Sequence, residues 1–434
     1  MKPTLFESAL LRERYWSVTH QSGLRVFVFP KKLTSAYAVL ATAYGSLDVS
    51  FRTADRADFT TVPDGVAHYL EHKLFDNPDG TDAFARFSAL GADANAYTDY
   101  TKTAYLFSTS SRFDESLAEL LRFVTSPYFT PATVAKEQGI IAEEIRMYRD
   151  NPSDRCLQNL LEGLYQTHPV RRSICGSEQS IARITADLLY ECYNTFYQPS
   201  NMILCVCGDV SPERVLETVD RVLPAPSAPR TVIRAPICEP DDVAAAYKEE
   251  TMPVAKPLFY LATKDTVIPA DAHERLRRDA AMTVLSEVLF SRSSPFFSRL
   301  FEEGLLTTSY SNGYSGTDSF AFHSVCGESD NPLAVRDRLL AYVDEIRSRG
   351  IPEADFLRAR RGLIADQIRA YDSTEEICTN LLSFALESVD LFSYPGLLSS
   401  VTVPDCERLL NEVFRPDRTC LSVIRPTAAQ GKTF

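Results

Sequence analysis

The protein has 434 residues, which at about 100–200 residues per domain predicts more than one domain. Its 45% hydrophobic and 24% charged residues are typical of a soluble globular protein, and no run of eighteen apolar residues offers a membrane span. With 45 basic and 58 acidic side chains the net charge is −13, which repels a nucleic-acid backbone, so no nucleic-acid partner and no membrane partner is expected.

The first residues, through Arg14, carry charged side chains before any long apolar run, so we expect no secretory signal and a cytoplasmic location. Ten cysteines are scattered singly apart from Cys205-x-Cys207, whose apolar neighbours predict a buried strand. The spacing predicts neither a zinc ribbon nor a disulfide framework.

A short helix is predicted after Pro63-Asp64-Gly65. On this helix His68 and His72 are four residues apart and share one face, with Glu71 beside them. This is the H-x-x-E-H pattern of the inverzincins, in which both imidazoles bind zinc. The alternative is a solvated polar helix face.

A third ligand is expected because a catalytic zinc ion takes three protein ligands and leaves the fourth position for water. The helical pattern over Lys136–Met147 offers Glu137 and Glu144, seven residues apart on one face, whereas Glu143 points elsewhere. We predict that Glu144 binds the metal and that Glu137 orients a ligand or the bound water.

Both halves of the chain mix helices and strands. Helical patterns cover Phe113–Val124 and Pro131–Tyr148, and alternating β-like runs cover Ala94–Ser108 and Ser319–Val325. The fold class is therefore predicted to be α+β, with a layer of sheet and helices in each half.

The halves resemble diverged copies. The segment around Pro199 matches that around Pro416, an offset of 416 − 199 = 217, and Ala142–Tyr148 matches Ala365–Tyr371 at 365 − 142 = 223. Five prolines between Pro224 and Pro240 indicate an extended connector. We predict an N-terminal zinc-binding domain at 1–226, a Pro-rich linker at 227–244, and a C-terminal homologous domain without a metal site at 245–434.

These features resemble the insulinase/pitrilysin superfamily of zinc peptidases over nearly the whole chain. The matching elements are His68-x-x-Glu71-His72, Glu137-x6-Glu144, Gly91-Ala92-Asp93-Ala94-Asn95-Ala96-Tyr97-Thr98, His168-Pro169, and Tyr197-x-Pro199-x-Asn201-Met202 running to Gly208-Asp209-Val210. The resemblance implies two homologous domains closing like a clamshell over peptides, with zinc on His68, His72 and Glu144 and with Glu71 as general base. It is greatest to bacterial members encoded as pairs, which implies a homologous partner subunit in a hetero- or homodimer.

The second half lacks the metal ligands. At an offset of 215, Thr283 and Glu287 replace the two histidines, Ser286 replaces Glu71, and Gln367 stands in place of Glu144 at the offset of 223. The second half is therefore expected to bind no zinc and to serve as the opposing wall.

In the family that wall commonly supplies an arginine and a tyrosine that hold the substrate carbonyl. Here Phe301 occupies the arginine position and Thr307 the tyrosine position. Tyr310 is the candidate catalytic tyrosine across a small insertion, and Arg299 or a partner subunit could supply the missing cation. An oxyanion stabiliser is worth a factor of about a hundred to a thousand in rate.

The expected function is a zinc metalloendopeptidase that acts on peptides or unfolded segments, with a homologous partner. Asn95 and Ala96 are expected to bind the substrate, because a strand there can pair with an extended peptide through main-chain hydrogen bonds; the alternative for Asn95 is a turn residue. The second hypothesis is a non-catalytic peptide-binding or scaffold subunit, favoured by the missing arginine and tyrosine. A purely structural zinc is disfavoured because such sites are closed by four protein ligands.

Overall fold

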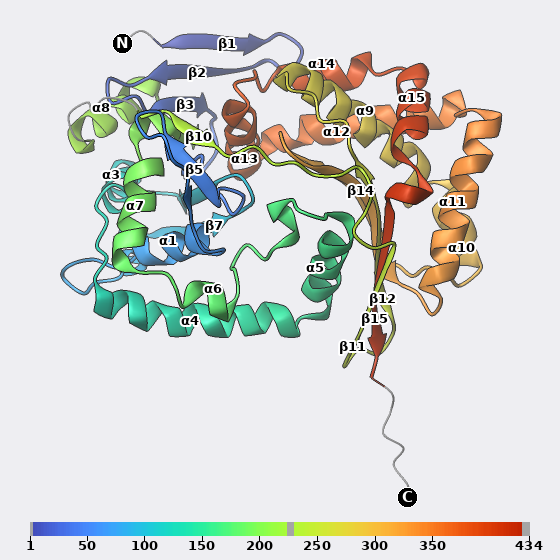
Figure 1. Ribbon diagram of the computed structural model, residues 1–434. Coiled ribbons are helices and arrows are strands. Elements are labelled where there is room, and N and C mark those ends of the chain that lie inside the picture. Colours follow the sequence, from blue (N-terminus) through green and yellow to red (C-terminus); the bar gives the residue numbers. More distant parts are fainter. Residues whose placement is uncertain (1–2, 224–229, 428–434) are drawn as a thin grey trace, which may run out of the picture. The chain divides into compact units, whose positions relative to one another are not determined.

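The structure is a computed structural model that describes residues 3–223 and 230–427 (Figure 1). The chain forms two compact units. Unit 1 comprises the described residues of Met1–Ile145, Ser173–Pro236 and Gln367–Phe392, and unit 2 those of Arg146–Arg172, Ile237–Asp366 and Ser393–Phe434. Both units are therefore built from discontinuous stretches of chain.

Unit 1 is organised around a seven-stranded sheet of order β1-β2-β3-β9-β4-β8-β7. Its strands are β1 (Thr4–Ser8), β2 (Glu13–Thr19), β3 (Arg25–Pro30), β4 (Ala36–Thr42), β7 (Ala92–Thr98), β8 (Thr103–Thr109) and β9 (Met202–Gly208). β3 and β9 are parallel, and the other neighbours are antiparallel. β9 contains Cys205 and Cys207 and is buried at every residue, which confirms the predicted buried strand.

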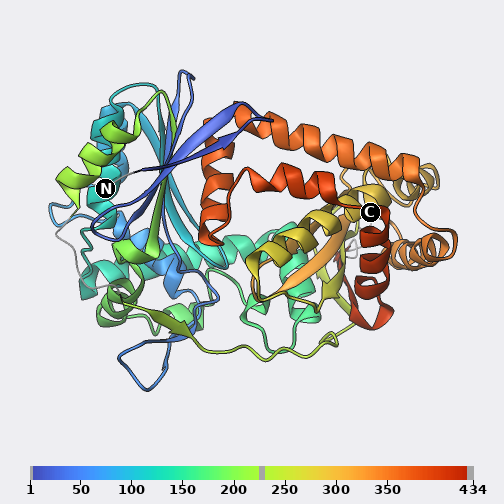
Figure 2. The ribbon, with the colours of Figure 1, turned by 90° about the horizontal axis from the view of Figure 1, so that it is seen from above.

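Helices cover both faces of this sheet. They are α1 (Val66–Leu74), α2 (Ala83–Leu90), α3 (Phe113–Val124), α4 (Pro131–Asp150), α6 (Glu178–Ile181), α7 (Ala186–Phe196), α8 (Pro212–Val222) and α13 (Thr374–Leu386), with short 3-10 turns η2 (Pro199–Asn201) and η3 (Ala370–Asp372). One core cluster joins the sheet to the helices from the first half of the chain. A second cluster joins the opposite face to α13, which Figure 2 shows in orange beside the sheet. α3 has the predicted bounds and α4 extends two residues beyond its predicted end.

Unit 2 contains a five-stranded sheet of order β11-β15-β12-β14-β13. Its strands are β11 (Tyr247–Met252), β12 (Leu258–Asp265), β13 (Ser311–Gly316), β14 (Ala321–Glu328) and β15 (Thr419–Pro426). Its helices are α5 (Pro152–Leu164), α9 (Ala272–Phe290), α10 (Pro295–Glu302), α11 (Pro332–Arg349), α12 (Glu353–Arg369), α14 (Ser393–Ser400) and α15 (Val403–Val413), with turns η1 (Pro169–Arg171) and η4 (Pro416–Arg418).

The two sheets share one topology, which confirms the α+β class and the duplication. The order β3-β9-β4-β8-β7 corresponds to β11-β15-β12-β14-β13, with a parallel first pair and antiparallel pairs after it in both units. The alternating runs at Ala94–Ser108 and Ser319–Val325 fall on the β7–β8 hairpin and on β14.

One helix in each unit comes from the other half of the chain. α5 lies on β12 and β15 of unit 2, with Leu160 and Leu161 buried, and α13 lies on β4 and β9 of unit 1, with Leu381 and Leu382 buried. The units therefore do not follow the single cut at 227–244. The physical reason is that each sheet has a second apolar face, which these helices cover.

The predicted linker, 227–244, begins outside the described residues, because 224–229 are not described. Within its described part, β10 (Val232–Arg234) pairs with β5 (Ser50–Thr53), and β6 (Thr60–Thr61) completes a small sheet in unit 1. Further along, the Glu239 carboxylate accepts backbone N–H groups from Gln166, Thr167 and His168 and pairs with Lys264 Nζ at 2.6 Å in unit 2. The described part of the linker is thus held to unit 1 through β10 and to unit 2 through Glu239.

Candidate metal centre

Helix α1 begins at a tightly packed turn. Gly65, its N-cap, has φ of 93°, which favours glycine. A Cβ at Gly65 would lie 2.5 Å from the carbonyl oxygen of Cys175, and a Cβ at Gly176 would lie 2.5 Å from that of Asp64. The Ser180 hydroxyl also donates to the Asp64 carbonyl (2.8 Å). The segment around Cys175 therefore fixes the start of α1.

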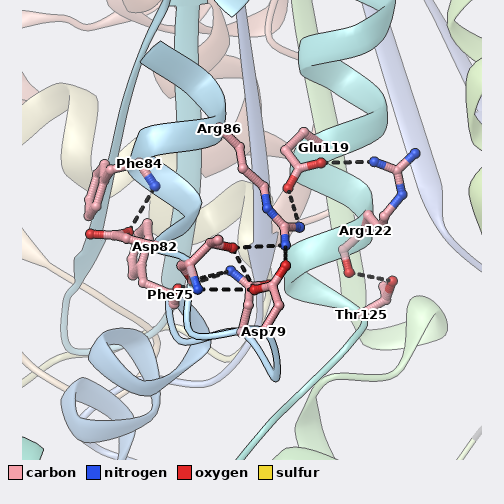
Figure 3. A network of polar contacts seen from close by, with 10 residues as sticks. Phe75, Asp79, Asp82, Phe84, Arg86, Glu119, Arg122 and Thr125 are labelled. Atoms are coloured by element: carbon pink, nitrogen blue, oxygen red, sulfur yellow. Dashed lines mark hydrogen bonds and ion pairs between the residues drawn. The ribbon is translucent and has the colours of Figure 1, made fainter. Parts of the chain in front are cut away.

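The end of α1 is fixed by a polar network (Figure 3). Arg86 of α2 donates to Asp79 in the loop after α1 (2.8 Å) and to Glu119 of α3 (3.2 Å). Beside this network Phe75 stacks on Phe84 with ring centroids 4.3 Å apart. Because both ends of α1 are held, the helix is a rigid support for its functional side chains.

The imidazoles of His68 and His72 converge on Glu144 of α4. Glu144 Oε2 lies 3.5 Å from His68 Nε2 and 3.2 Å from His72 Nε2, and the three ligand atoms lie within 4.8 Å of one another. The Tyr69 hydroxyl, which donates to the Val134 carbonyl at 2.5 Å, ties α1 to α4. The structure thus brings together the three residues predicted as ligands.

This donor set fits a divalent metal ion. Two imidazole nitrogens and one carboxylate oxygen are the three protein ligands of a catalytic zinc site, with one position left for water. Glu144 Oε2 is buried and makes no hydrogen bond of normal geometry, and His68 Nδ1 is likewise buried without a partner. Buried polar atoms normally have partners, so the arrangement lacks a group that a metal ion would supply for the carboxylate.

Glu137 lies one layer behind the ligands. Its Oε1 is 3.1 Å from His72 Nδ1, so the carboxylate can orient the imidazole with Nε2 toward the metal position. Burial lowers the pKa of His72, but the carboxylates of Glu137 and Glu144 outweigh it and raise that pKa to about 9. Burial alone would raise the pKa of Glu144, yet the two imidazoles hold it well below its usual range.

Glu71 is buried beside the ligands. The Thr98 hydroxyl, at the end of β7, donates to Glu71 Oε2 at 2.6 Å. Burial raises the pKa of the Glu71 carboxyl, although His68 and Thr98 act against that rise. The carboxylate therefore lies close to the metal ligands while it is held by a hydroxyl from the neighbouring sheet.

The candidate substrate residues lie on an exposed sheet edge. β7 ends the strand order of unit 1, so one side of it pairs with no strand in the described residues. Asn95 is exposed and sits within the strand rather than in a turn, and its Oδ1 accepts the Ala96 N–H at 2.9 Å. This N–H is thereby already hydrogen-bonded in the structure.

Tyr310, the candidate catalytic tyrosine, is buried in this structure. It is 0% exposed, and its hydroxyl donates to the Phe290 carbonyl at 2.8 Å within the core of unit 2. Arg299 pairs with Glu345 (2.9 Å), and Phe301 is 46% exposed. The ring of Tyr310 thus lies in the core of unit 2, where apolar burial determines its position.

Sequence reasoning missed two neighbours of the site. Thr98 was recognised only as part of a matching segment, although its place two residues after Ala96 puts it on the same strand face and so toward α1. Cys175 Sγ lies 3.8 Å from His68 Nε2. No local signal in the sequence indicated this contact, because it joins positions 107 residues apart.

Family models match most of the chain. The model described as "Insulinase (Peptidase family M16)" matches residues 58–178, and the model described as "Peptidase M16 inactive domain" matches residues 183–363. The first match contains the metal ligands predicted here.

Full-length relatives give the same result. The chain is 36% identical to the uncharacterized zinc protease YmfH of Bacillus subtilis over 98% of this chain and 99% of that protein. It matches an M16-like peptidase structure from Alicyclobacillus acidocaldarius with a TM-score of 0.91 and 33% identity, over 95% of this chain and 98% of the other. A protease structure from Helicobacter pylori, at 21% identity, has the same fold with a TM-score of 0.83 over 95% of this chain and 100% of that one.

Among the described residues, no helix combines the length and apolar character needed to cross a membrane.

Proposed function

The chain belongs to the insulinase family of peptidases, M16, and we propose that it is a zinc-dependent metalloendopeptidase that hydrolyses peptide bonds in peptides or unfolded segments. The observation that carries this proposal is the convergence of two imidazole nitrogens on Glu144 Oε2 with the buried carboxylate of Glu71 beside them. This combination provides metal ligands and a base in one place.

In the proposed reaction His68, His72 and Glu144 hold zinc, which when bound lowers the pKa of a water molecule and polarises the scissile carbonyl. Glu71 takes the proton from the attacking water and passes it to the leaving amine. Its raised pKa suits this double role, because a group whose pKa lies closer to the operating pH serves better both as base and as acid. Glu137 keeps the His72 ring oriented throughout.

The proposed substrate is an extended peptide added to the edge of β7. An antiparallel or parallel peptide strand there would use main-chain hydrogen bonds and so accept many sequences. To bind at Ala96 it would replace the Asn95 side chain on the Ala96 N–H. Asn95 would then be released to contact the peptide.

A homologous partner subunit is part of the proposal, together with a cytoplasmic location. The need for a partner is supported by the two residues of the second half that could hold the substrate carbonyl, since Tyr310 is buried and Arg299 is ion-paired. Groups that hold the substrate carbonyl would then come from a partner or from another conformation of this chain.

The test is the variant Glu71→Gln assayed with a fluorogenic peptide library, alone and with a candidate homologous partner. We expect full zinc content by elemental analysis but no cleavage, because Gln retains the size and loses the base. Undiminished cleavage would exclude Glu71 as the base. Cleavage that no chelator abolishes would exclude a metallopeptidase.

The second candidate function is a non-catalytic peptide-binding subunit, favoured by the exposed Phe301 where the family has arginine. It predicts that purified protein with zinc and partner binds peptides with measurable affinity and never cleaves them. Any cleavage that is lost in Glu71→Gln would decide for the peptidase.

A further inference from the structure

Beneath Glu71 lies a series of hydroxyl groups that the proposed reaction does not yet use. Thr98 Oγ1 is 2.6 Å from Glu71 Oε2 and 3.3 Å from Thr103 Oγ1. Thr103 is fully buried, and its hydroxyl also lies 2.9 Å from the Tyr44 carbonyl. Also in the core of unit 1, the Tyr197 hydroxyl lies 2.8 Å from that of Tyr105.

The number of protons on each group determines which group donates in each hydrogen bond of this series. An ionised carboxylate only accepts hydrogen bonds, so the single hydroxyl proton of Thr98 must point to Glu71. Any further hydrogen bond at Thr98 Oγ1 must then be one that it accepts. Thr103 also has a single hydroxyl proton, which it donates to the Tyr44 carbonyl at 2.9 Å, and its Oγ1 lies 3.3 Å from Thr98 Oγ1. The Thr98 hydroxyl is therefore orientated before any substrate arrives.

The support beneath the series is rigid. Thr98 and Thr103 are direct partners across the β7–β8 hairpin, and the Tyr105 and Tyr197 side chains are buried in the core of unit 1. Because these side chains are already ordered, they lose little further conformational entropy when a substrate binds. A water molecule or a flexible side chain in the same place could not fix Glu71 as closely.

We propose that Thr98, paired with Thr103 across the β7–β8 hairpin, is a positioning residue that fixes Glu71 Oε2 and leaves Glu71 Oε1 as the oxygen that takes the proton from water. This inference rests on the proposed function, since it assigns a role to the neighbour of the proposed base. Thr98 touches neither metal nor substrate in this role. Its contribution is the direction in which the carboxylate faces.

The kinetic test compares Thr98→Val with Thr98→Ser. We expect Val, which has the same shape without a hydroxyl, to lower kcat about 10- to 100-fold while KM and zinc content stay near those of the wild type, because misplaced catalytic groups cost about that much. Ser, which keeps the hydroxyl, should restore most of kcat. The matched control is Thr109→Val on β8, a buried threonine whose hydroxyl donates to the Ser111 carbonyl and which should leave kcat unchanged.

A second test needs no activity. In protein labelled with ¹³C at threonine, the Thr98 hydroxyl proton should exchange slowly with solvent, visible as a split Cβ signal in mixed H₂O and D₂O. Replacing Glu71 with Ala should make that proton exchange fast, whereas the Thr109 hydroxyl should not change. A fast-exchanging Thr98 hydroxyl in the wild type would overturn the inference.

The outcomes separate the two proposals. If the wild type cleaves peptides, Glu71→Gln does not, and Thr98→Val keeps the wild-type kcat, the positioning role is wrong and the peptidase stands. If Thr98→Val lowers kcat and Thr98→Ser does not restore it, the threonine acts through shape and the positioning role is again wrong. If the wild type never cleaves, the proposed function fails, and the role of Thr98 fails with it.

Discussion

Helix α1 of unit 1 and helix α9 of unit 2 hold corresponding places on corresponding sheets, yet among the described residues only α1 carries histidines of a group that could hold a metal ion. The correspondence can be followed along the strands. Three residues after Pro199 comes Met202, which pairs with Thr42, which pairs with Thr103; three residues after Pro416 comes Thr419, which pairs with Thr263, which pairs with His323. Thr103 and His323 are therefore equivalent positions below the two helices.

The side chains around these positions differ in kind. In unit 2 Ser286, which replaces Glu71, bonds His323 Nε2 at 2.9 Å and Asn312 Oδ1 at 2.7 Å. His323 is 2% exposed, and burial lowers its pKa to about 3. The polar group in unit 2 is thus neutral and satisfied by its own neighbours.

The comparison teaches that the fold alone does not make the site. In unit 1 small hydroxyls fill the space above the sheet and leave room for a carboxylate and two imidazoles, and Glu144 Oε2 is buried there without a hydrogen bond of normal geometry. In unit 2 the larger imidazole of His323, on a sheet strand, hydrogen-bonds Ser286 of the helix directly. A closed hydrogen-bond network stabilises a core, whereas an open one is available for a ligand.

The largest expected effect comes from removing a ligand in unit 1 and its counterpart in unit 2. His72→Ala should lose bound zinc and all peptide cleavage, because two ligands do not hold a catalytic zinc ion. Glu287→Ala, at the position equivalent to His72, removes a carboxylate that lines a separate pocket of unit 2 and should change neither. Elemental analysis of both purified variants measures the difference. Equal zinc content would mean that the sites are assigned wrongly.

The next largest effect concerns the exchanged helices. Leu160 of α5 and Leu382 of α13 occupy equivalent positions in the two helices. Their offset, 382 − 160 = 222, equals the offset between the helix starts, 374 − 152 = 222. Both side chains are 0% exposed. Replacing either with Ala should cost about 2–5 kcal/mol of unfolding free energy. Leu382→Ala should act on unit 1 although it lies in the second half of the chain.

The single tryptophan, Trp16 of β2, reports on unit 1. In a urea titration followed by its fluorescence, Leu382→Ala should lower the midpoint more than Leu160→Ala does, while circular dichroism should register both. Equal shifts of the tryptophan midpoint would show that the two units unfold as one.

A smaller effect is expected from Glu137→Gln. The variant keeps the size of the side chain but weakens the contact that orients His72, so zinc affinity should fall about 10- to 100-fold. Glu143→Gln, which removes the same charge from the exposed side of α4, is the matched control and should leave the affinity near that of the wild type. Competition with a chromophoric chelator measures both. A loss shared by the two variants would point to net charge instead of orientation.

Local pattern was enough to predict helices α1 and α4 and the residues that meet at Glu144. The four-residue spacing of His68 and His72 and the seven-residue spacing of the glutamates are properties of single helices, and both helices formed. The carboxylate that contacts His72 was also predicted, as a group that orients a ligand or the bound water. These predictions succeeded because helix periodicity fixes which side chains share a face.

What could not be predicted depends on contacts between distant segments. The placing of α13 on the first sheet joins residues more than 300 positions apart, as in the contact of Cys378 with Tyr37. The family resemblance offered Tyr310 as a catalytic tyrosine but could not indicate that its ring is buried in unit 2. Thr98 was visible in the sequence, and its role was not, since a threonine on a strand face has no distinctive pattern.

The smallest expected effect is a difference in pH response between the two units in metal-free protein. His72 has a pKa of about 9, above the value of about 6.5 in an unfolded chain. Its contribution to stability is therefore present below pH 6.5 and is lost as the pH rises through 9. His323 has a pKa of about 3 because of burial. Between pH 6.5 and 3 the unfolded chain binds the extra proton, so stability falls as the pH falls.

The variant His323→Thr gives unit 2 a threonine at the position equivalent to Thr103 of unit 1. It removes the pH response of His323 and leaves that of His72 in place. Each such proton contributes about 1.4 kcal/mol per pH unit, so between pH 6 and 4 the variant should lose stability less steeply than the wild type by about that slope. Between pH 7 and 9 the two proteins should behave alike, because His72 is unchanged. Urea midpoints followed by circular dichroism at these pH values measure both windows. The same acid slope in variant and wild type would mean that His323 is not held neutral, and that the network of unit 2 is less closed than its hydrogen bonds indicate.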